Sequence, residues 1–209
     1  MRKTKDDNLH AIAADARKKR LLHYARRQLI KCGYTNASIN DVIRLAGGSK
    51  ATLKKYFGNK AGLYSAVFDD VGRQFVERMN TLNFSGSLER TLQNMGEELL
   101  RFYLQPDAIN AFRAIVAEGY RNKQLAAGLY QGGHMALVHA VASRLEPWQA
   151  KGRIHCVDLL TAADQFTHIL RRGLYEETLI GLRKPKPPAR EIADTVRLAV
   201  KTFLRILRP

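Results

Sequence analysis

Apolar residues recur at the three- and four-residue spacing of an α-helix along almost the whole chain. Short alternating runs of β-branched residues, the pattern of a half-buried strand, are nearly absent. Proline occurs only six times, and Pro185, Pro187 and Pro188 fall together in one loop. The sequence therefore predicts an all-α protein of about nine helices.

Positive charge is concentrated in the first sixty residues. That segment holds 15 Lys and Arg against 4 Asp and Glu, whereas the rest of the chain holds 20 against 15. A basic segment of this kind favours a polyanionic partner, nucleic acid first and an anionic membrane second. A well-solvated surface without such a partner is the alternative that charge alone leaves open.

The residues that usually carry catalysis are scattered. No nucleophile lies in a recognisable elbow, no glycine-rich phosphate loop occurs, and no His, Glu or Cys cluster has metal-ligand spacing, so we expect no enzyme, no cofactor and no metal site. Cys32 and Cys156 are far apart, which disfavours a disulfide framework. Without a signal peptide or a long apolar run, we expect a cytoplasmic protein with no membrane partner.

The N-terminal third divides into four predicted helices. The first covers residues 10–31 and ends at Gly33. A second begins at Ser38, and a short third helix is capped by Ser49. The fourth covers residues 60–80.

The second and third helices form a predicted helix-turn-helix, because a glycine-containing turn, Ala46-Gly47-Gly48, joins them. The second helix of such a unit can enter the major groove of DNA, where lysines reach phosphates or guanine edges. Leu53 is expected to face inward, while Lys50, Thr52, Lys54 and Lys55 form the polar side. An ordinary αα-hairpin with a solvated lysine face is the alternative.

Residues on either side of this motif can add phosphate contacts. Ser38 and Asn40, at the start of the second helix, offer hydroxyl, amide and backbone N–H groups. Lys60, at the start of the fourth helix, is expected to contact a phosphate beside the positive end of the helix dipole.

A longer pattern surrounds the motif. It runs Gly33-Tyr34, Ser38-Ile39-Asn40-Asp41-Val42, Ala46-Gly47-Gly48-Ser49-Lys50-Ala51-Thr52-Leu53, Tyr56-Phe57-Gly58-Asn59-Lys60, Leu63-Tyr64 and Ala66-Val67. In the order and the gaps of these residues the chain resembles the N-terminal signature of the TetR/AcrR family. Two positions depart from it: Lys54 replaces the usual aromatic residue, and Gly48 replaces a common valine. Lys54 is expected to make DNA binding more dependent on salt, and Gly48 to make the turn more flexible.

The resemblance implies a helix-turn-helix head, residues 1–65, and a helical regulatory and dimerisation body, residues 66–209. It implies a transcriptional regulator, a repressor in the commoner mode, that binds a palindromic operator in double-stranded DNA as a homodimer and is released by a small-molecule effector. The expected DNA-contacting residues are Ser38, Asn40, Ser49, Lys50, Ala51, Thr52, Lys54, Lys55, Tyr56 and Lys60.

The body is predicted to hold helices at residues 87–104, 107–117, 120–145, 152–181 and 189–207. Runs such as Arg171-Arg172-Gly173-Leu174 resemble one class of TetR-type C-terminal domains, in which the last two long helices pair across a two-fold axis. Apolar stripes on these two helices suit such a contact, and the core of a single chain is the alternative. The dimer contacts expected from the stripes are Phe166, Leu170, Leu174, Val196 and Phe203.

Aromatic and polar residues of the body provide candidates for an effector site. Aromatic residues at helical spacing suit a core equally well, so burial decides between the two roles. The ligand-binding candidates are Phe102, Phe112, Glu118, His134, Trp148 and Phe166.

Two other functions compete with a site-specific regulator. The basic head could bind DNA without reading its sequence, and a specificity ratio at fixed salt separates that function from operator binding. A membrane-surface role is less well supported, because the first helix lacks Trp or Phe on its apolar face.

Overall fold

The computed structural model describes residues 2–82, 86–155 and 158–207, with side chains from Ile12 onward. All regular elements in these residues are helices, which confirms the predicted all-α class. With α7, η1 and α8 counted as one continuous run there are ten, one more than expected. The elements are α1 (Arg2–Asn36), α2 (Ile39–Ala46), α3 (Lys50–Phe57), α4 (Lys60–Thr81), α5 (Leu88–Tyr103), α6 (Pro106–Glu118), α7 (Lys123–Gly128), the π-helical segment η1 (Leu129–Met135), α8 (Ala136–Ala150), α9 (Leu159–Arg171), α10 (Leu174–Leu179) and α11 (Ala189–Ile206).

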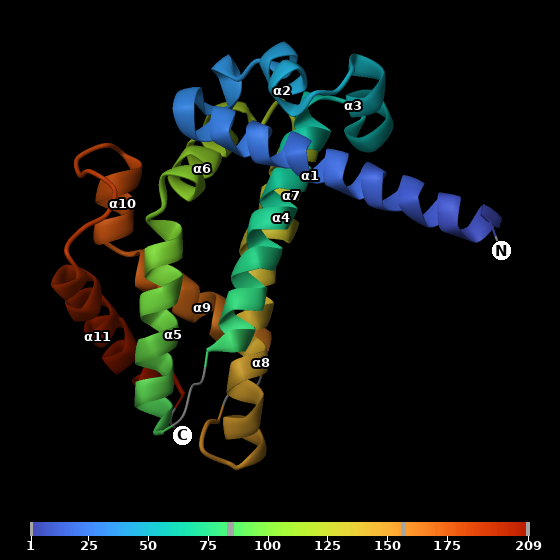
Figure 1. The fold of residues 1–209 in the computed structure, drawn as a ribbon. Coiled ribbons are helices and arrows are strands. Elements are labelled where there is room, and N and C mark those ends of the chain that lie inside the picture. The colour runs from blue at the N-terminus through green and yellow to red at the C-terminus, as the bar shows by residue number, and fades with distance from the viewer. Residues whose placement is uncertain (1, 83–85, 156–157, 208–209) are drawn as a thin grey trace.

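Helix α1 is longer than the sequence predicts. It starts at Arg2 and not near residue 10, because no proline or glycine interrupts the intervening residues. Its N-terminal half projects away from the rest of the molecule (Figure 1). Leu21, Ala25 and Leu29 are buried on one face, as expected. The helical geometry is broken at Gly33, where φ is 72° and ψ is 176°, a conformation that glycine tolerates best.

Side-chain caps and one left-handed glycine define the helix-turn-helix. Ser38 Oγ accepts a hydrogen bond of 3.2 Å from the backbone N–H of Asp41 and so caps α2. Ser49 Oγ accepts one of 3.1 Å from the N–H of Thr52 and caps α3. Between them Gly47 has φ 67° and ψ 47°, which ends α2 and turns the chain. The local sequence thus determines both helix starts.

Helix α4 connects the head to the body. Its first half contributes Leu63 and Phe68 to the apolar core of the head, and its second half contributes Phe75 and Met79 to the core of the body. In Figure 1, α4 descends from the head alongside α7 and α8. The boundary that we predicted at residue 65 falls within this helix.

The backbones of α4 and its neighbours α7 and η1 are in direct contact. A Cβ atom on Gly72 would lie 2.0 Å from the carbonyl oxygen of Gly132, and one on Gly128 would lie 2.0 Å from the hydroxyl of Ser65. No side chain fits at such distances. These glycines therefore allow the helices to approach closely, beside a π-helical segment of the kind that often occurs at functional sites.

Two predicted body helices have different bounds in the structure. The helix expected at 120–145 is the run from α7 through α8, which starts at Lys123 and ends at Ala150. The helix expected at 152–181 is divided into α9 and α10 at Gly173, where φ is 74° and ψ is −94°. Helical spacing on both sides hides this break in the sequence, and a glycine is what makes it possible. No described helix is both long enough and apolar enough to span a bilayer.

The side chains that we expected at the dimer contact are buried within one chain. Phe166, Leu170 and Val196 pack toward Gly96 of α5, where an added Cβ would lie 2.8–3.3 Å from their atoms. Leu174 and Phe203 are also buried in the body core. Both apolar stripes therefore face inward, and it is the opposite faces of α9 and α11 that lie on the surface.

Candidate DNA-binding face and ligand cavity

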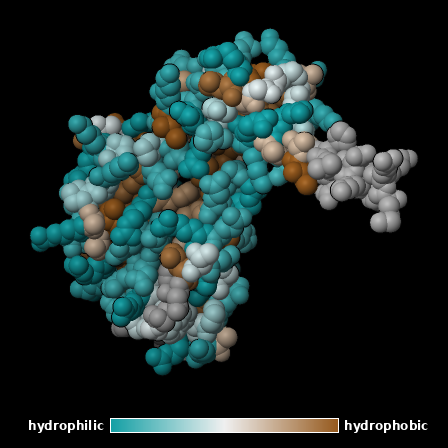
Figure 2. Space-filling model, viewed as in Figure 1, coloured by the Kyte–Doolittle hydropathy of each residue, from teal (hydrophilic) through white to brown (hydrophobic). Residues whose placement is uncertain are grey.

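Helix α3 presents three exposed lysines on the outside of the head. The ammonium groups of Lys50, Lys54 and Lys55 form no hydrogen bond or ion pair with any other described residue. Leu53 is buried beneath them, as the sequence predicts. On the face shown in Figure 2, hydrophilic side chains cover much of the head. Cations on this surface are free to meet an external anion.

The other expected contacts of α3 differ in their exposure. Thr52 is partly buried, and its hydroxyl lies 3.0 Å from that of Ser49, so both groups are already used in the helix cap. Tyr56 is partly buried and its ring meets that of Phe57 edge to face. Ala51 is exposed. Hydroxyl groups in this helix thus support its geometry, while the lysines carry its charge.

The N-terminus of α2 is the second part of the face. Asn40 is exposed, and Ser38 is partly buried because its hydroxyl caps the helix. The first backbone N–H groups of a helix lack helical acceptors and carry its positive dipole, so they can bind a phosphate.

Lys60 is the first residue of α4, as expected, but its ammonium already has partners within the chain. Its ammonium donates a 3.1 Å hydrogen bond to the carbonyl of Thr35 and lies 4.8 Å from the centre of the Tyr34 ring. Burial lowers the pKa of Lys60. The side chain therefore ties α4 to the end of α1, and a phosphate would have to compete with these contacts.

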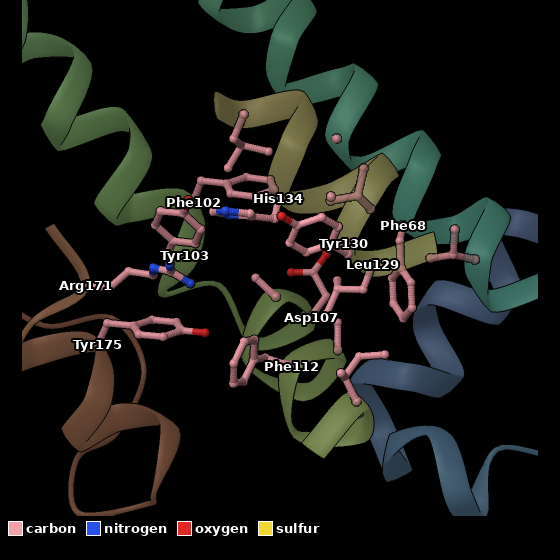
Figure 3. Close-up of a pocket in the computed structure, with 18 of the residues that line it drawn as sticks. Phe68, Phe102, Tyr103, Asp107, Phe112, Leu129, Tyr130, His134, Arg171 and Tyr175 are labelled. Atoms are coloured by element: carbon pink, nitrogen blue, oxygen red, sulfur yellow. The ribbon is translucent and has the colours of Figure 1, made fainter. Parts of the chain in front are cut away.

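A cavity of about 460 Å³ lies between the head and the body. Its walls come from the head helices α1 and α4 and from the body elements α5 to α10. Figure 3 shows aromatic rings pointing into it from several helices. Small-molecule sites in proteins have similar volumes and are similarly apolar.

Three of the six expected ligand residues line this cavity: Phe102, Phe112 and His134. The other three, Glu118, Trp148 and Phe166, do not.

Each of those three has a different place in the fold. Glu118 ends α6, where it accepts a hydrogen bond from Thr35 of the head. Trp148 packs against the body core near the far end of α8. Phe166 is fully buried against Phe203, with ring centres 4.8 Å apart. The sequence cannot distinguish these positions from cavity-lining ones, because helical spacing does not show how deeply a side chain is buried.

An ion pair in the cavity wall joins the two parts of the chain. Arg26 of α1 donates a 2.6 Å hydrogen bond to the carboxylate of Asp107 on α6, and a further bond of 3.2 Å to Gln74. Asp107 is 5% exposed. Sequence analysis missed this residue, since an Asp after Pro106 also suits a helix start.

A second polar cluster in the wall is centred on Asp164. Its carboxylate is 2.8 Å from Nε2 of His134, and its backbone carbonyl is 2.9 Å from Nδ1 of His168. Burial lowers the pKa of His134, and the nearby Arg171 guanidinium lowers it further. The sequence predicted no metal-ligating cluster, yet one potential ligand atom from each of these three residues lies within 4.8 Å of the others. The residue types suit a divalent transition metal, but the positive charge of Arg171 disfavours a cation there.

A helix-turn-helix head with a free lysine face, carried by a helical body with an internal cavity, defines the two-part class of DNA-binding regulators. Residues 21–67 match the family model of bacterial regulatory proteins of the tetR family, and residues 90–208 match that of the AefR-like transcriptional repressor, C-terminal domain. The chain belongs to the TetR family of bacterial transcriptional regulators.

Solved structures share the fold at low sequence identity. A TetR-family regulator from Mesorhizobium loti is 21% identical with a TM-score of 0.80, over 92% of this chain and 97% of its own. The flavonoid-responsive regulator FrrA is 23% identical with a TM-score of 0.71, over 92% and 97%. The fatty acid degradation regulator FadR from Bacillus halodurans is 16% identical with a TM-score of 0.68, over 91% and 99%. No curated protein matches the sequence.

The family confirms two expectations from the sequence. The chain is a DNA-binding transcriptional regulator, and, like other members, it is not an enzyme.

Proposed function

We propose that the protein is a homodimeric repressor that binds a palindromic operator in the cytoplasm and leaves it when a small molecule fills the cavity. The observation that carries the proposal is the free lysine face of α3 on a head whose first helix also forms part of the cavity wall. The match to an AefR-like repressor domain supports repression.

The contacts to DNA come from two helix starts. Helix α3 enters the major groove, where Lys50, Lys54 and Lys55 reach phosphates and base edges. The start of α2, with Ser38 and Asn40, binds a flanking phosphate. Ser49 and Thr52 hold the first turn of α3 in place.

The effector acts on the contact between head and body. Leu29 of α1 and Phe68 of α4 line the cavity together with α6 residues such as Ala111. A ligand lodged there presses on helices that carry the head. The head can then take a position that fits the operator or one that does not. The difference in the ligand's affinity for these two states sets how much the operator affinity falls.

The dimer forms through the outward faces of α9 and α11. On α11, Leu198 and Ile206 are 64% and 46% exposed, and Thr202 lies between them at four-residue spacing. Apolar side chains on one exposed helix face favour a protein partner. A second copy of the chain buries these apolar side chains and brings two heads to one operator.

Selection of genomic DNA fragments by the purified full-length protein near physiological salt tests the proposal. A single enriched palindrome is the expected result. Uniform recovery of all fragments would overturn it in favour of the sequence-indifferent binder that the basic head also suits. A control with Lys50, Lys54 and Lys55 replaced by Ala should lose the enrichment.

A further inference from the structure

We propose that the cavity binds an amphipathic organic anion, whose carboxylate or similar group is held by Arg171 and whose apolar part extends toward the head. This inference rests on the proposed effector site and specifies the chemistry of its ligand. The sign of the charge and the position of the charged end both follow from the residues of the wall.

The formal charges of the wall sum to zero, so the sign follows from which charged side chain lacks a partner. The residues in the wall that carry formal charge are Arg26, Asp107, Asp164 and Arg171. Arg26 and Asp107 neutralise each other. Asp164 is hydrogen-bonded to His134 and also lies 3.3 Å from His168. Among the described residues, Arg171 has no carboxylate within 4.0 Å. It is the one charged group of the wall with neither an ion-pair nor a histidine partner.

The surroundings of Arg171 suit an anion. Its guanidinium lies 5.4 Å from the centre of the Tyr103 ring and 6.0 Å from that of Tyr175, while Nε donates to the carbonyl of Thr167. Burial raises the pKa of Tyr103 and raises that of Tyr175 to about 12, so both phenols stay protonated and can donate to a ligand oxygen. A partly buried guanidinium binds a carboxylate strongly because its N–H groups match the two oxygens.

Toward the head, the cavity wall is mainly apolar, apart from the ion pair of Arg26 and Asp107. In Figure 3, Arg171 and the two tyrosines lie on one side, and Phe68 and Leu129 lie on the other. Phe102 and Phe112 also line the space. A ligand with one charged end and an aromatic or alkyl body fits this division, because burial of its apolar surface adds affinity without asking for further polar partners.

Pairs of ligands that differ only in charge test the proposal on the full-length wild-type protein. Calorimetry would compare 2-naphthoate with 2-naphthamide, and decanoate with decanamide. At least one acid should bind about tenfold or more tightly than its amide, the gain expected of a charged hydrogen-bonded partner. Equal affinities within both pairs, or binding by none of the four compounds, would overturn the proposal.

Two adjacent arginines give matched variants. Arg171→Gln should remove the preference for the acid and leave the amide affinity unchanged. Arg172→Gln changes the net charge equally, but Arg172 is exposed and outside the cavity wall, so it should change neither affinity. An equal loss for acid and amide in Arg171→Gln would contradict the assignment.

Two further measurements distinguish a failure of the proposed ligand class from a failure of the proposed operator binding. Circular dichroism would establish that each variant is folded, and if Arg171→Gln is not, the acid-to-amide contrast of the wild type decides. Fragment selection without ligand reports on operator recognition alone. A protein that selects a palindrome yet binds no acid would retain its proposed DNA function and lose this ligand class.

Discussion

The guanidinium of Arg26 on the first helix of the head forms an ion pair with the carboxylate of Asp107 on a body helix, 81 residues away. Asp107 is nearly buried, whereas the Arg26 side chain is 31% exposed. The pair is therefore intermediate between a surface and an interior ion pair. It is also a direct polar link between the DNA-binding head and the cavity.

A double-mutant cycle measures what this pair contributes. We expect Arg26→Gln and Asp107→Asn each to destabilise the protein, with a coupling free energy of about 1–3 kcal/mol, between the values for exposed and buried pairs. Urea unfolding of the four proteins gives the number. A matched cycle on the exposed pair Arg197–Asp194 should give less, and a coupling near zero at Arg26–Asp107 would contradict the link.

Replacing one lysine of α3 should weaken DNA binding. Lys55→Ala is expected to lower operator affinity and to reduce the slope of log affinity against log salt concentration by about 1, because one phosphate contact is lost. The Lys55 side chain is exposed and forms no hydrogen bond or ion pair with the described residues, so the melting temperature should not change. Lys151→Ala, an exposed lysine of the body, is the control. Operator affinity equal to the wild type would remove Lys55 from the DNA face.

A charge on the outward face of α11 should separate the dimer. Leu198→Glu places a carboxylate where we propose that two chains meet, and desolvating an unpaired charge there is unfavourable. Sedimentation at micromolar concentration should change from dimer to monomer. Val116→Glu, on an equally exposed site of α6, should remain dimeric. If Leu198→Glu sediments as the wild type does, the interface lies elsewhere.

The contact of α4 with η1 should not tolerate a methyl group. In Gly72→Ala the new Cβ would lie 2.0 Å from the carbonyl oxygen of Gly132, so the helices must separate, at a cost of about 2–3 kcal/mol in unfolding free energy. Gly133→Ala is the control, since its Cβ meets only the flexible Leu129 side chain at 3.2 Å. Denaturant unfolding should show a large loss for the first variant and little change for the second.

His134 should make stability depend on pH. Burial lowers its folded-state pKa below the unfolded value of about 6.5, so the unfolded chain binds the proton more readily. Stability is then highest above pH 6.5 and falls as the pH drops toward the lower folded-state pKa. His134→Gln should reduce this loss, measured by urea unfolding from pH 8 to pH 5. His139→Gln, which replaces an exposed histidine of α8, is the matched control.

The head could be predicted almost completely from the sequence because its determinants are local. Ser38 and Ser49 cap the helices that they precede, and Gly47 supplies the left-handed turn between them. Each of these features depends on residues no more than a few positions apart. The same locality explains why the apolar face of α1 was correct although its start was not.

The body could be predicted only in outline because its determinants are distant in sequence. An apolar stripe has the same helical period whether it meets another chain or its own core, so Phe166 and Val196 could not be placed in advance. The position of Arg171 between two tyrosines depends on α5, α9 and α10 coming together. Only packing brings such groups to one cavity.

The close approach of Gly72 and Gly132 couples the movement of α4 to that of η1. Because α4 and η1 touch through their backbones at these residues, neither helix can tilt without carrying the other. Tyr130 and His134, which project from η1 into the cavity, must then travel with the long helix on which the head is mounted. A movement that starts at the ligand is therefore passed from the cavity wall directly to the helix that supports the head.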